Sequence, residues 1–188
     1  AGAEGAVAEA ARNIAAVGGA PLAITDCLNF GNPETPAVMG QFEAAVEGIS
    51  RGCEALGIAV VSGNVSFYNE TEGVAIPPTP SIGMVGLVGD VSQHVGIAFR
   101  SNGDHVYLVG NDEPTLGGSE YLAVLHGLEA GVPPQVDWEK ERAVCELVRQ
   151  GIQGGQIHSA HDLSSGGLAV ALAECILAGG KNPCGAEV

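Results

Sequence analysis

The first third of the chain alternates between helix-like and strand-like hydrophobic patterns. In residues 4–17 apolar side chains recur every three or four positions until Gly18-Gly19, which predicts a helix. A short apolar run at 21–25 predicts a strand, with Asp26 just past its end. Thr35 and Pro36 then supply the cap and first turn of a longer helix. Gly57 closes this helix, whose apolar stripe is Phe42, Val46, Ile49, Cys53 and Leu56.

Strands and a second group of elements follow. Residues 58–62 and 81–88 predict strands, separated by a proline-rich loop at 70–80. A polar stretch at 90–104 places a domain boundary near residue 98, giving domains at 1–97 and 98–188. The second domain is expected to hold strands at 105–109 and 156–160, helices near 121–128, 138–152 and from 164 onward, and the opening of a strand at 183–188. The pattern favours an α+β fold, two-layer α/β with mixed sheets.

Composition and charge exclude several classes of partner. The chain has 22 acidic and 7 basic residues and a formal net charge of −15. Such a surface repels nucleic acid and anionic membranes, so neither is an expected partner. No apolar run reaches the roughly 18 to 20 residues that span a bilayer.

The cysteines indicate a reducing compartment. They are five in number, scattered, and include no CxxC pair. The simplest interpretation is a cytoplasmic protein with inert, buried thiols.

Three places share one local arrangement, in which an apolar strand ends in a polar, glycine-containing turn: 26–34, 63–70 and 161–167. Ligands collect at strand ends because backbone N–H groups and helix N-termini converge there. Asp26 and Asn64 offer oxygens that suit Mg²⁺, Gly63 allows close backbone approach, and Ser66 offers a hydroxyl. We expect Asp26 and Asn64 to face a common cleft. The alternative is that each is an ordinary solvated turn residue.

The distribution of basic residues limits how a phosphate could be bound near these turns. No Lys or Arg occurs at 20–34 or 59–82, so a bound phosphate needs a metal, backbone N–H groups or residues outside this chain. This favours a Mg²⁺-bound nucleotide in a composite site. A zinc site at His158, His161 and Asp162 is disfavoured, because side chains three apart in a strand diverge. No P-loop is present, and Gly117-Gly118 alone is a weak phosphate signal.

Taken together, these segments resemble one enzyme family. The strings ITDCLNFGNPE (24–34), SGNVSFYNE (62–70), PTPSIG (78–83), LGGSEY (116–121) and HDLSSGGL (161–168) resemble those of formylglycinamide ribonucleotide amidotransferases, also called phosphoribosylformylglycinamidine synthases. Their synthetase subunit is similar to two tandem aminoimidazole ribonucleotide synthetase-like units, each with an N-terminal and a C-terminal domain. This chain resembles the second unit, as a fragment in which both domains are expected to be incomplete.

The resemblance implies roles for particular residues. Asp26 and Gly63 match ATP-binding positions, Asn64 a Mg²⁺ ligand and Ser66 a substrate-contacting position. Asp162 matches a metal-binding residue by internal pseudo-symmetry. A possible auxiliary nucleotide site is implied at Gly117, Gly118 and Ser119. The family's catalytic histidines and ATP-binding lysine belong to the first unit, so no catalytic residue is expected here.

The implied activity is that of an ATP-dependent C–N ligase of purine biosynthesis, with ATP and Mg²⁺ as cofactors. ATP phosphorylates the amide oxygen of formylglycinamide ribonucleotide, and ammonia displaces phosphate from the imidophosphate. The implied partners are the missing first half of the synthetase, a glutaminase subunit and a small accessory subunit.

Two alternatives stay open. One is another ATP enzyme of the superfamily, such as aminoimidazole ribonucleotide synthetase. The other is a non-catalytic, nucleotide-binding structural half. For the amidotransferase assignment, the fragment alone is expected to be inactive, because the catalytic histidines and the ATP-binding lysine belong to the first unit.

Overall fold

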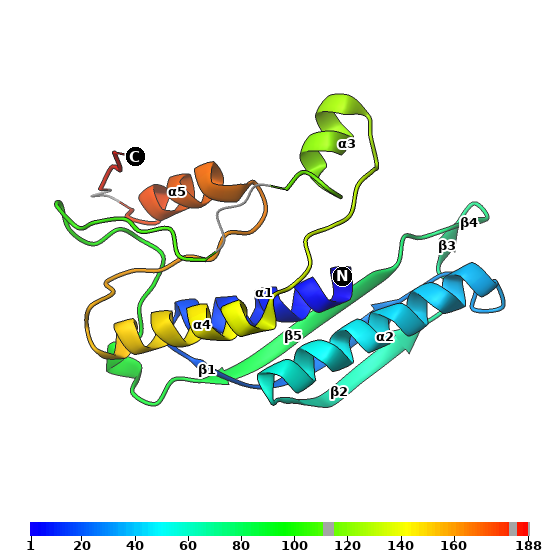
Figure 1. The fold of residues 1–188 in the computed structure, drawn as a ribbon, viewed down its shortest axis with the longest axis horizontal. Coiled ribbons are helices and arrows are strands. Elements are labelled where there is room, and N and C mark those ends of the chain that lie inside the picture. Colours follow the sequence, from blue (N-terminus) through cyan, green and yellow to red (C-terminus); the bar gives the residue numbers. More distant parts are fainter. Residues whose placement is uncertain (111–114, 181–183, 188) are drawn as a thin grey trace.

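A three-stranded sheet with helices on one face forms the first part of the chain (Figure 1). The computed structural model describes residues 1–110, 115–180 and 184–187. The sheet contains β1 (Ala20–Asn29), β2 (Ala59–Ser66) and β5 (Thr79–Leu87), in the order β2-β1-β5. Helices α1 (Gly2–Ala16) and α2 (Pro36–Leu56) cover the sheet, and α4 (Trp138–Gln153) packs against these two helices. A small hairpin of β3 (Glu70–Thr71) and β4 (Val74–Ala75) follows β2.

The sheet is mixed, as the sequence predicted. β1 pairs with β2 in parallel and with β5 antiparallel. The register places Asp26 between Gly63 on one side and Ile82 on the other. The parallel connection runs through α2, which is the crossover helix that such a pair needs.

The core lies between the sheet and the helices. Alternate residues of β1, namely Ile24 and Leu28, are buried against the helices, and Phe30 just beyond the strand joins them. Phe30 meets Phe42 edge to face at 5.4 Å between ring centroids, a favourable aromatic geometry. The helical partners are Ala3, Val7, Ala45, Ile49 and Cys53.

The predicted long helix is confirmed at both ends. α2 begins at Pro36 after the N-cap Thr35, and Gly57 ends it in the left-handed region, with φ 67°. The Gly57 N–H donates to the carbonyls of Cys53 and Glu54, which satisfies acceptors that the helix end leaves free.

The helices predicted for the second part are also present. They are α3 (Glu120–His126), α4 and α5 (Gly167–Leu177), and a 3₁₀ turn, η1 (Val91–Gln93), precedes them. None of the described helices is both long and apolar enough to cross a membrane.

The strands predicted at 105–109 and 156–160 are wrong. Both segments are irregular, and Val106, Tyr107 and Leu108 are exposed. An isolated apolar run does not persist as a strand, because its backbone N–H and C=O groups need a neighbouring strand. Residues 156 and 157 instead donate to the Gly151 carbonyl and finish the end of α4. Residues 184–187 form no strand, and the rest of the strand predicted at 183–188 lies outside the described residues.

Polar contacts join α4 to the first helices. The Trp138 indole donates to Glu4 at 2.7 Å, and Arg12 donates to Glu141 at 2.7 Å. Arg51 of α2 also reaches Glu4, at 3.3 Å. These contacts fix α4 beside α1, where it covers the helical layer (Figure 1).

Candidate functional site

Asp26 of the central strand β1 and Gly63 of the edge strand β2 form one closely fitted pair. They are register partners on the parallel strands β1 and β2. A Cβ at position 63 would lie 2.5 Å from Asp26 Oδ1, so the Asp26 carboxylate occupies the space that a side chain there would need. The pair lies on the face of the sheet that the helices cover. Asp26 is two residues from both Ile24 and Leu28 along β1, so it shares their face, and both are buried against the helices.

The Asp26 carboxylate also affects the pKa of a cysteine in the helical layer. Burial raises the pKa of the Cys53 thiol of α2, and the negative charge of Asp26 raises it further. Asp26 was expected just past the end of β1, but β1 continues to Asn29. A carboxylate in mid-strand is therefore built into this face of the sheet.

Asn64 and Ser66 lie on the opposite, open face. The expected turn at 63–66 is part of β2, and successive strand residues point to opposite sides. Asn64 is thus beside Cys27, and Ser66 beside Asn29. Our expectation that Asp26 and Asn64 face a common cleft is wrong, because strand alternation separates them.

The open face carries no charged side chain. Asp26 is the one charged residue in β1, β2 and β5, and it faces the helices. The open face combines small polar groups near the strand ends with apolar groups at the other end. It is formed by Ala23, Thr25, Cys27, Asn29, Ser62, Asn64, Ser66, Thr79, Ser81, Val85 and Leu87.

Asn69 ties the ends of β1 and β2 together. Its Nδ2 donates to the carbonyl oxygens of Ser66 at 2.9 Å and Phe30 at 3.0 Å. Its Oδ1 lies 3.2 Å from the Ser66 hydroxyl. The sequence analysis covered this residue within a longer string without assigning it a role. Its contacts depend on a chain reversal that no local pattern signals.

Tyr68, beside Asn69, has an unusual backbone conformation. Its φ of 58° is left-handed, which costs a non-glycine residue roughly 1–2 kcal/mol. The Tyr68 N–H donates to the Gly31 carbonyl at 3.0 Å, which helps hold this conformation. The Tyr68 side chain remains exposed at the end of β2.

Asp162 presents a buried oxygen with no partner among the described residues. Its side chain is 7% exposed, and Oδ1 contacts His161 Nδ1 at 3.2 Å. Oδ2 has no hydrogen bond in the described structure. The other ring nitrogen of His161 contacts Glu174 at 3.0 Å, while His158 contacts Asp104 at 3.0 Å. The two histidines thus engage different carboxylates, and no group of three or more metal-ligating side chains forms within the described parts of the chain.

The 117–119 loop is closed by contacts within the chain. A Cβ at Gly117 would collide with the Val132 carbonyl oxygen. Ser119 caps α3, accepting from the Leu122 N–H at 3.4 Å and donating to the Leu116 carbonyl at 2.7 Å. These groups are therefore engaged in folding the loop and in starting a short helix.

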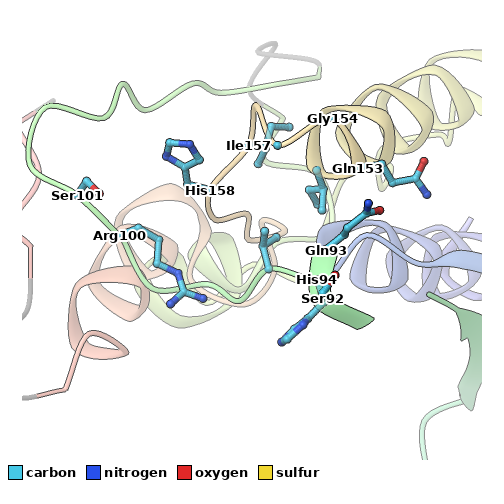
Figure 2. Close-up of a pocket in the computed structure, with 12 residues that line it drawn as sticks. Ser92, Gln93, His94, Arg100, Ser101, Gln153, Gly154, Ile157 and His158 are labelled. Atoms are coloured by element: carbon cyan, nitrogen blue, oxygen red, sulfur yellow. The ribbon is translucent and has the colours of Figure 1, made fainter. Parts of the chain in front are cut away.

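An open depression of about 670 Å³ lies elsewhere, between η1 and the end of α4 (Figure 2). Its lining includes Gln93, Arg100 and His158, and none of the predicted site residues. Figure 2 shows these side chains spread around its rim. The depression is separate from the Asp26–Gly63 pair.

The chain belongs to the AIR synthase related proteins. Residues 1–88 match the family's N-terminal domain, and residues 101–188 match its C-terminal domain. This assignment and the mixed α+β fold confirm the family and fold class predicted from the sequence. The boundary near residue 98 stays a prediction.

Within this class the chain is similar to subunit PurL of phosphoribosylformylglycinamidine synthase. The Moorella thermoacetica subunit is 61% identical over 183 residues, which are 97% of this chain and 25% of that protein. The chain thus spans about a quarter of the length of the curated relative it matches.

Solved structures agree. Thermotoga maritima PurL complexed with ATP is 29% identical, with a TM-score of 0.59 over 82% of this chain and 22% of that chain. PurLQS from Thermotoga maritima is 31% identical, with a TM-score of 0.55 over 79% of this chain and 21% of that chain.

Proposed function

We propose that the chain is the second synthetase-like unit of an ATP-dependent ligase that converts formylglycinamide ribonucleotide to formylglycinamidine ribonucleotide. The observation that carries this is the 61% identity to a PurL subunit over almost the whole chain. The glycine-dependent fit of Gly63 against Asp26 supports a specialised role for that pair. The reaction forms an O-phosphorylated imidophosphate, from which ammonia displaces phosphate.

In this proposal Asp26 and Gly63 contribute to ATP binding. The glycine leaves the β2 backbone accessible beside the carboxylate, and a larger residue would displace the Asp26 side chain. A fixed, half-buried carboxylate can accept hydrogen bonds from a sugar or a base.

Mg²⁺ is the proposed metal, and the oxygen donors of the chain suit it. Asn64 offers an exposed amide oxygen, and Asp162 a buried carboxylate oxygen without a partner in the described residues. Hard cations prefer such oxygens and keep phosphates and waters in their shell. When bound, the metal supplies positive charge to the phosphate groups. Asn64 would hold it at the main site, Asp162 would hold a metal at the separate auxiliary nucleotide site, and Ser66 would contact the substrate.

The open face of the sheet supports a partner that supplies charge. Val85 and Leu87 are exposed on it, and it has no charged group of its own. We assign this face to the N-terminal domain of the first half of the same synthetase. Asn64 and Ser66 then lie at a composite site, and the partner brings the lysine and histidines that this chain lacks. Glutaminase and small accessory subunits complete the assembly, as the PurLQS assembly of the similar protein suggests.

A second candidate is a structural half that binds nucleotide without turnover. The separation of Asp26 and Asn64 onto opposite faces favours it, because one nucleotide cannot simply bridge them within this chain. The 117–119 loop, proposed as an auxiliary nucleotide site, would belong to this binding role. The five cysteines are all free, which is consistent with the cytoplasmic location proposed for either candidate.

The test compares the chain with the full-length synthetase. With formylglycinamide ribonucleotide, ATP, Mg²⁺ and ammonia, the full-length protein should release ADP and product, and the 188-residue chain should not. Adding the separately made first half should restore turnover if the open face is its docking surface. Normal turnover by a full-length protein that carries Asn64→Ala, together with ATP binding by the 188-residue chain, would establish the structural alternative.

A further inference from the structure

Ser66 and Asn69 define the direction of a hydrogen bond at the proposed substrate position. Asn69 Nδ2 has two hydrogens, and two backbone carbonyl oxygens lie at 2.9 and 3.0 Å from it. Carbonyl oxygens only accept, so the amide nitrogen must face them. These two contacts fix the orientation of the Asn69 amide group, with Nδ2 toward the carbonyl oxygens.

The remaining atom of the amide is its oxygen, and it faces Ser66. The Ser66 hydroxyl donates to Asn69 Oδ1 at 3.2 Å. The contact of 3.2 Å between Asn69 Nδ2 and the same hydroxyl is longer than the two carbonyl contacts that already use both amide hydrogens. A serine hydroxyl has a single hydrogen, and in this arrangement that hydrogen is donated to Asn69 Oδ1.

We infer that Ser66 meets its ligand as a hydrogen-bond acceptor, and that Asn69 is the positioning residue that imposes this. Ser66 therefore recognises an N–H or O–H group, such as an amide or a sugar hydroxyl, and not a phosphate oxygen. The inference rests on the proposed function, in which Ser66 contacts the substrate. It adds the chemical class of the group that is recognised.

The surroundings agree with this assignment. Ser66 lies beside Asn29 on the open face, and Asn29 lies beside Thr79 on the next strand. The strands β1, β2 and β5 contribute no cationic side chain to this face, so the counter-charge for a phosphate would have to come from the partner or from a metal. A neutral donor group needs no counter-charge, so Ser66 can meet it as an acceptor without help from either.

The Ser66–Asn69 link is tested first, without any ligand. Ser66→Ala, Asn69→Ala and the double variant of the 188-residue chain are compared by thermal melts. The losses in Tm should be non-additive, with the double variant losing less than both singles together. Additive losses would overturn the link. If Asn69→Ala does not fold, Ser66→Thr should keep the Tm that Ser66→Ala loses.

The ligand class is tested in the full-length synthetase. Ser66→Ala should raise KM for formylglycinamide ribonucleotide about tenfold, as the loss of a good hydrogen bond does. The inhibition constant for inorganic phosphate should change by less than about twofold in the same variant. Ser50→Ala, an exposed serine of α2 that lies outside the open face, is the control and should leave both unchanged.

The outcomes separate the two hypotheses. Equal weakening of phosphate inhibition and substrate affinity, or an unchanged KM, would overturn the donor-group assignment. A wild-type synthetase without turnover would refute the proposed function and the assignment resting on it. The melts would still decide whether Asn69 orients Ser66.

Discussion

The Trp138 indole N–H donates a 2.7 Å hydrogen bond to Glu4 Oε1, which joins the start of α4 to the first turn of α1. Glu4 is 7% exposed, and its other oxygen accepts from Arg51 at 3.3 Å. Each oxygen of this buried carboxylate therefore has a partner. The contact makes a residue of the second family domain part of the first domain's helical layer.

Trp138→Phe should destabilise the chain by about 1–3 kcal/mol, because it leaves a buried carboxylate oxygen unpaired while keeping most of the ring. Urea unfolding would measure this loss. Arg149→Ala is the control, because its ion pair with Glu146 lies within α4, is partly exposed, and should change the free energy of unfolding by less than about 1 kcal/mol. Equal effects would mean that the indole bond contributes little.

Gly63→Ala should destabilise the chain by about 1–3 kcal/mol and weaken ATP binding by the full-length protein. The new methyl group would lie 2.5 Å from Asp26 Oδ1, so strand or carboxylate must shift. Gly40→Ala in α2 meets nothing within 4 Å and should instead stabilise by about 0.5–1 kcal/mol. Melts and ATP titrations would check both variants, and an unchanged Gly63→Ala protein would refute the predicted collision.

Asn64→Ala in the full-length synthetase should lower turnover about 100- to 1000-fold, as the loss of one electrostatic contact to a reacting group does. Stability should change by roughly half a kcal/mol or less, since Asn64 is exposed. Steady-state kinetics at several Mg²⁺ concentrations, with parallel melts, would measure both. Wild-type turnover at low Mg²⁺ would make Asn64 an ordinary strand residue, and unfolding would make it structural.

The chain should lose stability in alkaline solution. Burial raises the pKa of Cys53, Cys145 and Cys175 above the ordinary value of 9.0. A raised pKa means that the folded state holds these protons more tightly than the unfolded state. Their contribution is therefore complete below about pH 9 and falls as the pH rises through the folded values. Tm measured from pH 7 to 10.5 should decline above pH 9, and Cys145→Ala should decline less steeply. An equally steep decline would assign the effect to other groups.

Local patterns predicted the first domain well because its signals are local. Pro36 and Gly57 mark the ends of α2 by backbone preferences that depend on neighbouring residues alone, and Thr35 stands at the N-cap without a side-chain capping bond. The strands at 105–109 and 156–160 were wrong because a strand depends on a partner elsewhere in the chain. An apolar run does not reveal whether that partner is present.

The candidate site was predicted in part, and the error has a simple physical origin. The sequence identified Asp26, Gly63, Asn64 and Ser66, but it treated 63–66 as a turn. Because β2 continues to Ser66, alternation sends Asn64 away from Asp26. The role of Asn69 depends on carbonyl oxygens of two strand ends, and no spacing rule within one segment predicts such a contact.

The placement of α4 bears on how this protein can be recombined with its relatives. A chimera that joins the first domain of this chain to the second domain of another must bring an indole to Glu4 and a carboxylate to Arg12. Without them, one oxygen of the buried Glu4 carboxylate loses its hydrogen-bond donor and Arg12 loses its ion pair, even though each domain is intact. Trp138, Glu4 and Arg51 are therefore best transferred as a set, and the exchangeable segment of this fold does not coincide with either family domain.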